Sequence, residues 1–71
     1  MIKYLVVIEK ANDGGYGGWV PDLPGVIGMG DTYDSALDNT VEGIKFHLEG
    51  MKEEGYDIPP PNAKSEMLVI A

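Results

Sequence analysis

The chain has 71 residues and no cysteine, and its 12 acidic against 5 basic side chains give a formal net charge of -7. A chain this short forms one domain at most, and its small core needs further support that disulfide bonds cannot supply here, so self-association is expected. Because the charge repels phosphate backbones and anionic lipids, we expect no direct binding of nucleic acid or membranes, whereas a basic protein would be attracted.

The first expected element is a strand over residues 2–9, which are rich in β-branched and aromatic side chains. Alternation places Tyr4 and Val6 on one face and Leu5 and Val7 on the other. Because both faces are apolar at the middle, the pattern favours a central strand that is covered on two sides.

Two further strands are expected after the first one, at residues 16–20 and 26–29. Asp13-Gly14 predicts a hairpin turn, since both residues can take positive φ. Gly17 and Gly18 would weaken the second strand unless another group packs closely against them. Pro24-Gly25 suits the two central positions of a type II turn.

The longest periodic segment predicts a helix from about residue 32 to about residue 54. Asp31 or Thr32 can cap its first amides, and Gly55 suits its C-terminal end. The apolar side chains recur every three or four residues and form one stripe, composed of Tyr33, Leu37, Thr40, Val41, Ile44, Leu48 and Met51. This stripe can lie on a sheet.

After the helix, the prolines at 59–61 favour an extended path, and residues 67–70 predict a short apolar strand. The fold class is therefore α+β (α/β-like), of order β-β-β-α-β, with a three-stranded antiparallel meander and one main helix on one face. A right-handed crossover would place the fourth strand parallel to the first and beside it. The other face holds Leu5 and Val7, together with Trp19, Ile27 or Met29 as further candidates, and we expect a second copy to bury it.

The outward surface of the expected helix carries a lone phenylalanine, Phe46, which points almost directly away from the apolar stripe. Its neighbours there are two glycines, one amide and three carboxylates: Gly43, Gly50, Asn39, Glu42, Glu49 and Glu53. Each helix glycine costs about 1 kcal/mol relative to alanine, which is easier to understand if another chain approaches. Two interpretations stay open, a contact surface for a basic partner and one stray surface aromatic.

The remaining polar residues predict no catalytic, metal or cofactor site. His47 lies at the margin of the stripe without a catalytic partner, so a packing role is expected. Asp31, Asp34 and Asp38 could approach a hard cation, but acids near a helix start are ordinary for electrostatic reasons. The glycines at 14–18 join strand to strand and are not followed by the Gly-Lys-Ser/Thr of a phosphate loop.

Several motifs follow one another in a fixed order along the chain. Asp13-Gly14-Gly15-Tyr16 precedes the Val-Pro-Asp-Leu-Pro-Gly-Val run at residues 20–26, and Gly30-Asp31-Thr32 opens the helix. The runs at residues 44–51 and 55–61 form the helix end and a proline tail. Together these segments resemble the N-terminal domain of HicB-like antitoxins, in that family's short form, and we expect one such domain over residues 1–71.

The resemblance implies a partly degraded ribonuclease-H-like fold that assembles as a homo-oligomer, either a dimer or a tetramer. It also implies a partner, a small basic HicA-type toxin that cleaves mRNA and that the antitoxin neutralises. Members of the family often carry a C-terminal DNA-binding domain, which is not expected here, so operator binding stays open. Because the N-terminal apolar run is too short for an export signal, we expect the cytoplasm.

Three functions follow from these patterns. The first is an antitoxin that covers the RNA-binding or catalytic surface of a basic toxin. The second is a stand-alone homo-oligomeric interaction module without a cognate toxin. The third is a metal-dependent nuclease, which we do not expect because the strands lack a set of acids that could hold two metal ions.

Overall fold

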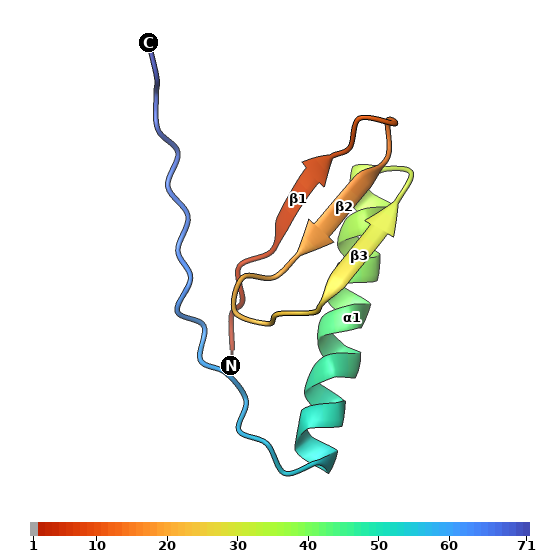
Figure 1. Ribbon diagram of the computed structural model, residues 1–71, viewed down its shortest axis with the longest axis vertical. Coiled ribbons are helices and arrows are strands. Elements are labelled where there is room, and N and C mark those ends of the chain that lie inside the picture. The colour runs from red at the N-terminus through yellow and green to blue at the C-terminus, as the bar shows by residue number, and fades with distance from the viewer. Residues whose placement is uncertain (1) are drawn as a thin grey trace.

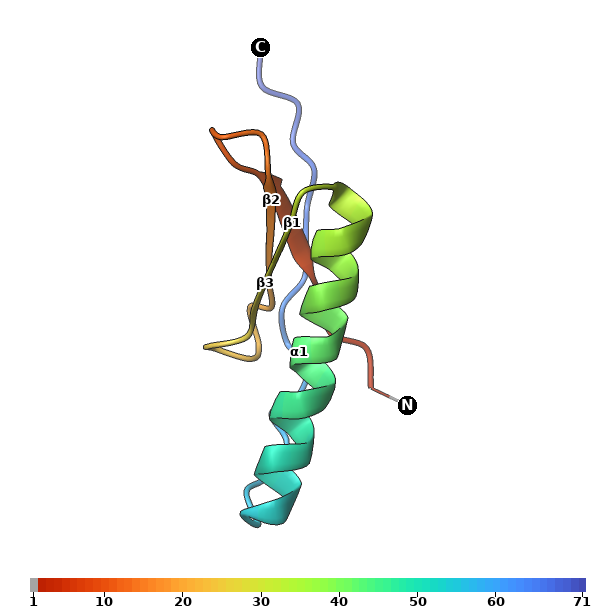
Figure 2. The ribbon, with the colours of Figure 1, turned by 90° about the vertical axis from the view of Figure 1, so that its right-hand side faces the viewer.

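The computed structural model describes residues 2–71, which contain three strands and one helix (Figure 1). The strands β1 (Val7–Lys10), β2 (Tyr16–Trp19) and β3 (Ile27–Gly30) form an antiparallel sheet of order β1-β2-β3. The helix α1 (Tyr33–Glu53) lies on one side of this sheet, and the other side is bare (Figure 2). The α+β class and the antiparallel meander are therefore confirmed.

The two loops between the strands depend on glycines with positive φ. Gly14 has a φ of 92°, and since none of the non-glycine residues described has a positive φ, only the second residue of Asp13-Gly14 is left-handed. Gly25 has a φ of 94°, and the Val26 amide donates to the Leu23 carbonyl at 3.2 Å. Pro24 and Gly25 therefore occupy the centre of a type II turn, as predicted.

Both ends of α1 are capped by backbone and side-chain hydrogen bonds. The Thr32 hydroxyl accepts from the Ser35 amide at 3.0 Å, and the Ser35 hydroxyl accepts from the Thr32 amide at 3.1 Å. At the other end Gly55 has a φ of 76° and donates to the Lys52 carbonyl, while the Tyr56 amide donates to Met51. These last two bonds make a Schellman motif, so Gly55 ends the helix as predicted.

Close contact between α1 and the sheet depends on glycines in the strands. An added Cβ at Gly18 would overlap the Thr40 hydroxyl, and one at Gly28 would overlap the Thr40 backbone nitrogen. Thr40 is fully buried and donates to the Ala36 carbonyl at 2.7 Å. Gly18 therefore has the close neighbour that the sequence requires, whereas Gly17 has no described atom within 4 Å of an added Cβ.

The core of the fold is small. Its buried apolar residues are Val20, Leu23, Val26 and Ala36, and half-buried side chains pack against them, namely Tyr4, Val6, Ile44 and Leu48. Three of the buried residues lie in or beside the loop between β2 and β3. The core is therefore concentrated where this loop meets the middle of α1.

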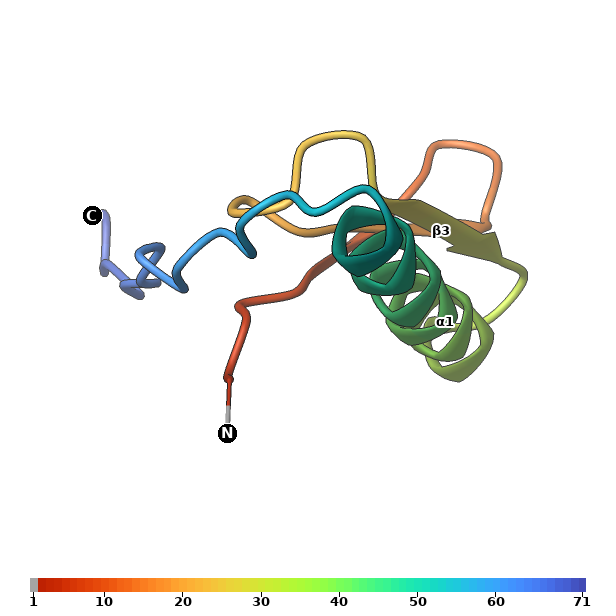
Figure 3. The same ribbon diagram turned by 90° about the horizontal axis from the view of Figure 1, so that it is seen from below.

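Two expectations about the sheet are wrong for this structure. The first strand begins at Val7 instead of Ile2, and it lies at an edge of the sheet instead of at its centre. Residues 67–70 form no fourth strand, because within residues 2–71 no backbone hydrogen bond joins them to β1. They extend beyond the β1 side of the sheet (Figures 1 and 3).

The segment after α1 contacts the rest of the fold at two points. The Tyr4 hydroxyl donates to the Pro59 carbonyl at 2.6 Å, and the Asp22 carboxylate accepts from the Ala63 amide at 3.0 and 3.2 Å. Beyond Ala63 every residue is exposed. We call residues 64–71 the C-terminal tail.

Candidate protein-binding surfaces

The side of the sheet that faces away from α1 is apolar, and we call it the outer sheet face. Strand register aligns Val7, Trp19 and Ile27 in one row across the three strands. The next row, of Ile8, Gly18 and Gly28, faces the helix. Because side chains alternate along a strand, the following row, of Glu9, Gly17 and Met29, is again on the outer side. Trp19, Ile27 and Met29 are exposed. The prediction that Val7 and Trp19 share an uncovered apolar face therefore agrees with the strand register.

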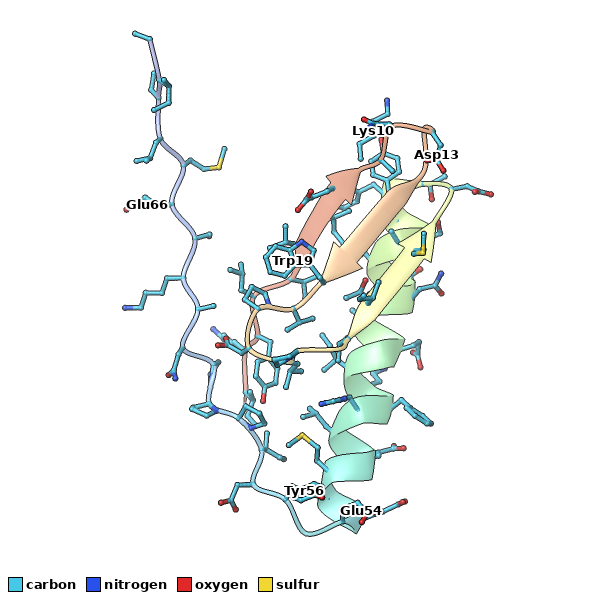
Figure 4. The ribbon with its side chains drawn as sticks, in the orientation of Figure 1. Lys10, Asp13, Trp19, Glu54, Tyr56 and Glu66 are labelled. Carbon is cyan, nitrogen blue, oxygen red and sulfur yellow. The ribbon has the colours of Figure 1, made fainter. Side chains whose placement is uncertain are left out.

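Trp19 forms one wall of a groove on the outer sheet face (Figure 4). The indole Nε1 donates to the Glu9 carboxylate at 3.0 Å, which holds the ring toward β1. The groove has a volume of about 400 Å³ and is lined by Glu9, Lys10, Ala11, Gly17, Gly18, Trp19 and Ile27. Because Gly17 has no side chain on the outer face, a side chain of another protein can enter here. Leu5, the other residue predicted for this face, is half-buried and precedes β1.

The second candidate surface is the outward side of α1, which we call the helix patch. At its centre the Phe46 side chain is 80% exposed. Glu42 and Glu49 are exposed about one turn to either side, and Glu53 is exposed about two turns beyond Phe46 along the helix. Lys45 forms an ion pair with Glu42 at 3.5 Å. Lys45 offsets one of the three negative charges, so the patch keeps a net negative charge. The patch therefore presents an aromatic ring among carboxylates, which is a suitable surface for a basic protein.

Three other residues predicted for the helix patch have different roles. Asn39 donates from its side chain to the Met29 carbonyl of β3 at 2.6 Å. An added Cβ at Gly43 would lie 3.3 Å from the Val26 side chain, so this glycine allows the helix to pack on its own sheet. Gly50 is exposed, and no described atom lies within 4 Å of an added Cβ. Only Gly50 therefore has the open surroundings that a partner could use.

A hollow at the C-terminal end of α1 extends the helix patch. It has a volume of about 300 Å³ and is lined by Phe46, His47, Gly50, Met51, Glu53, Glu54 and Tyr56. Tyr56 is exposed and lies beside Glu54 at the base of the molecule (Figure 4). We did not predict Tyr56 or Glu54 for this surface. The available indication was Gly55, because a Schellman motif folds the next residue back over the last helical turn.

Other kinds of site have little support among residues 2–71. They contain no group of three or more histidine and acidic side chains that could hold a metal ion. His47 is half-buried, in keeping with a packing role. In the described part of the chain, no helix has both the length and the apolar character needed to cross a membrane.

The sequence of this chain matches the model of a protein family over residues 4–69. The family is described as the HicB-like antitoxin of bacterial toxin-antitoxin systems. The chain belongs to this family. A UPF0150 protein of Thermoplasma acidophilum is 41% identical over 63 residues, which cover 89% of this chain and 91% of that protein.

Two further proteins that are similar to this chain are longer than the region they share with it. A 14.9 kDa protein of Haemophilus phage HP1 is 48% identical over 59 residues, covering 83% of this chain and 44% of the phage protein. The crystal structure of the N-terminal domain of the Burkholderia pseudomallei antitoxin HicB has 40% sequence identity and a TM-score of 0.73. It covers 78% of this chain and 65% of that domain. The three strands and the helix therefore have the arrangement of a HicB N-terminal domain.

Proposed function

We propose that this HicB-like chain is an antitoxin that binds a small basic HicA-type toxin and so prevents it from cleaving mRNA. The observation that carries this proposal is the helix patch, where an exposed Phe46 lies among Glu42, Glu49 and Glu53. A ribonuclease must hold phosphate with basic groups. The carboxylates of the patch compete for those groups, and the aromatic ring supplies apolar contact area.

In this proposal the chain acts by covering a surface and performs no chemistry. The site of action is the cytoplasm, where the mRNA substrate of the toxin is found. In this proposal the ribonuclease-H-like fold reflects common ancestry with nucleases and carries no nuclease activity. A magnesium titration with labelled RNA and the purified chain should produce no cleavage product, and magnesium-dependent cleavage would contradict the proposal.

The test uses a HicA-type ribonuclease encoded beside this chain and measures cleavage of labelled RNA together with binding. Wild-type chain should inhibit cleavage at equal concentration. Phe46→Ala should weaken binding about 30-fold, since truncation of a central aromatic typically costs about 2 kcal/mol. Trp19→Ala is the matched control, because it removes an exposed aromatic from the outer sheet face. It should change the affinity no more than about threefold, within the range of a residue outside the interface.

Each outcome of this test has a definite meaning. Failure to bind or inhibit any such ribonuclease rejects the antitoxin proposal. Weakening by Trp19→Ala but not by Phe46→Ala retains the function and assigns the toxin to the outer sheet face.

One observation favours the second candidate function, a stand-alone homo-oligomeric module. The outer sheet face exposes Trp19, Ile27 and Met29 side by side, and surfaces of this kind mark sites of association. We propose that a second copy covers this face in either case, as a dimer or as part of a tetramer. Only the first function requires a toxin, so the binding test above distinguishes the two functions.

A further inference from the structure

The strand β1 lies at an edge of the sheet, and its first half is apolar on both faces, whereas Glu9 and Lys10 in its second half are charged and exposed. Val7 faces the outer side of the sheet and Ile8 faces the helix side, where it lies close to Gly18. Apolar side chains on both faces are typical of strands whose two faces are covered. An edge strand also has unpaired backbone groups that can accept another strand. The free edge of β1 can therefore pair with a further strand, and the described part of its own chain places none there.

The opposite edge of the sheet is less available. The Asn39 side chain of α1 already binds a backbone carbonyl of β3, that of Met29. The helix also packs more closely over β3 than over β1. Of the two edges, β1 is the one at which a further strand meets fewer obstacles.

The C-terminal tail contains a segment that matches β1. Residues 67–70 are Met, Leu, Val and Ile, and each side chain is at least 73% exposed. The segment is four residues long, as β1 is. In a strand, Met67 and Val69 would share one face and Leu68 and Ile70 the other, so both faces would be apolar. A segment of this kind is stable only when it is covered on both sides.

We propose that two copies of this chain exchange their C-terminal tails, with residues 67–70 of each copy adding as a strand to β1 of the other. Exchange of identical elements is a low-cost route to a dimer, because the contacts are repeated by symmetry. The tail already lies beyond β1, near the level of the sheet, and not over the outer sheet face (Figures 1 and 2). Self-assembly of this kind does not depend on the presence of a toxin.

The linker favours a second copy over closure onto the same chain. Tyr4 holds Pro59, and Asp22 holds Ala63, so the start of the tail is fixed. The prolines between these points stiffen the path and keep it extended. With its start fixed in this way, the tail extends away from its own β1 and can reach another copy without a change in the linker.

Charge also favours contact between copies at the tail. Lys64 and Glu66 are the charged side chains of residues 64–71, and they cancel, so the net charge of -7 lies on the rest of the chain. Two such acidic chains repel each other. The tail is a neutral apolar segment through which they can meet with less repulsion.

Paramagnetic NMR can test the exchange without knowledge of the strand register. The chain has no cysteine, so Ala71→Cys carries a single nitroxide label. Chain that carries the nitroxide but no ¹⁵N is refolded together with ¹⁵N-labelled wild-type chain that carries no nitroxide. Exchange should broaden the amide signals of Val7–Lys10 in the ¹⁵N-labelled copy. A nitroxide at Glu54→Cys, on the exposed end of α1, is the control and should leave these signals unchanged.

Sedimentation gives the second measurement. Wild-type chain should have at least twice the mass of one chain. The double variant Leu68→Asp with Ile70→Asp should have half the wild-type mass and keep a folded spectrum, since both side chains are exposed in the isolated chain. Ser65→Asp, also in the tail, should keep the wild-type mass.

Three results would overturn the exchange. The first is a wild-type mass of one chain. The second is broadening of β1 signals only when the nitroxide and ¹⁵N are in the same chain. This result would mean that the tail pairs with β1 of its own chain. The third is a dimer in which the nitroxide broadens Ile27 and Met29 and leaves β1 unchanged, which means that the tail lies on the outer sheet face.

Discussion

The hydroxyl of Tyr4 donates a hydrogen bond of 2.6 Å to the carbonyl oxygen of Pro59, although 55 positions separate the two residues in the chain. The bond ties the segment after α1 to the residues that precede β1. Burial of the phenol, and then the nearby charge of Asp22, raise the pKa of Tyr4 above its ordinary value of 10.0. The folded chain therefore favours the protonated phenol, which is the form that donates.

Tyr4→Phe should lower stability at neutral pH by about 1 kcal/mol, the usual contribution of one hydrogen bond. Because the folded-state pKa is raised, the contribution of Tyr4 is fully present below pH 10 and is lost as the pH rises through the folded-state value. The difference between wild type and Tyr4→Phe should therefore shrink in alkaline solution. Urea unfolding of both chains from pH 7 to pH 11 measures it.

Tyr56→Phe is the matched control for this prediction, since it removes the same hydroxyl from an exposed ring at the end of α1. It should change the free energy of unfolding by less than about 0.5 kcal/mol. A constant difference between wild type and Tyr4→Phe across the whole pH range would contradict the role assigned to the Tyr4 hydroxyl.

Adjacent glycines in β2 should differ strongly in their response to the same substitution. Gly18→Ala would force a Cβ into the Thr40 hydroxyl and to 2.8 Å from Ile8 Cδ1, so we expect a loss of about 2 to 3 kcal/mol. Gly17→Ala meets no described atom within 4 Å and should stay within about 0.5 kcal/mol of wild type. Thermal unfolding of the two variants compares them directly. Equal losses would mean that α1 does not approach the sheet as closely as described.

Local sequence signals predicted most of the fold because they act over a few residues. Pro24-Gly25 requires a particular turn, Gly55 a particular helix end, and the apolar stripe of α1 a sheet to lie on. Each of these predictions is confirmed. Phe46 was likewise placed on the outward helix surface by angular spacing alone, and it is exposed.

The errors arose where position depends on distant parts of the chain. The apolar pattern predicts a strand with two covered faces at residues 2–9 and a short apolar strand at residues 67–70. A local pattern does not specify which strand, or which chain, lies beside them. The pattern also did not show that Gly43 faces Val26, because these two residues are distant in sequence. The hydrogen bond between Asp22 and Ala63 joins two loops, and no periodic pattern predicts such a contact.

The N-terminal cap of α1 offers a prediction about stability. Thr32→Ala should cost about 1 kcal/mol, because the first amides of the helix lose the acceptor that the threonine hydroxyl supplies. Asp31→Ala is the control, since the cap is made by Thr32 and Ser35. It should change stability by less than about 0.5 kcal/mol. Chemical unfolding measures both variants. A larger loss for Asp31→Ala than for Thr32→Ala would contradict the assignment of Thr32 as the cap.

The position of the acidic groups, and not only their number, should control the rate at which a basic toxin associates. Replacing Glu42, Glu49 and Glu53 with glutamine removes three charges from the helix patch. At low salt the association rate should fall roughly tenfold, because steering depends on the local potential. At high salt the rates of variant and wild type should converge, since exposed charges are screened.

A second triple variant separates local charge from total charge. Asp13→Asn, Asp57→Asn and Glu66→Gln remove the same number of exposed charges away from the helix patch. If the patch meets the toxin, this variant should keep most of the wild-type association rate at low salt. Stopped-flow fluorescence at several salt concentrations measures both rates. An equal decrease in the two variants would show that net charge alone attracts the toxin, and it would remove the electrostatic reason for placing the toxin on α1.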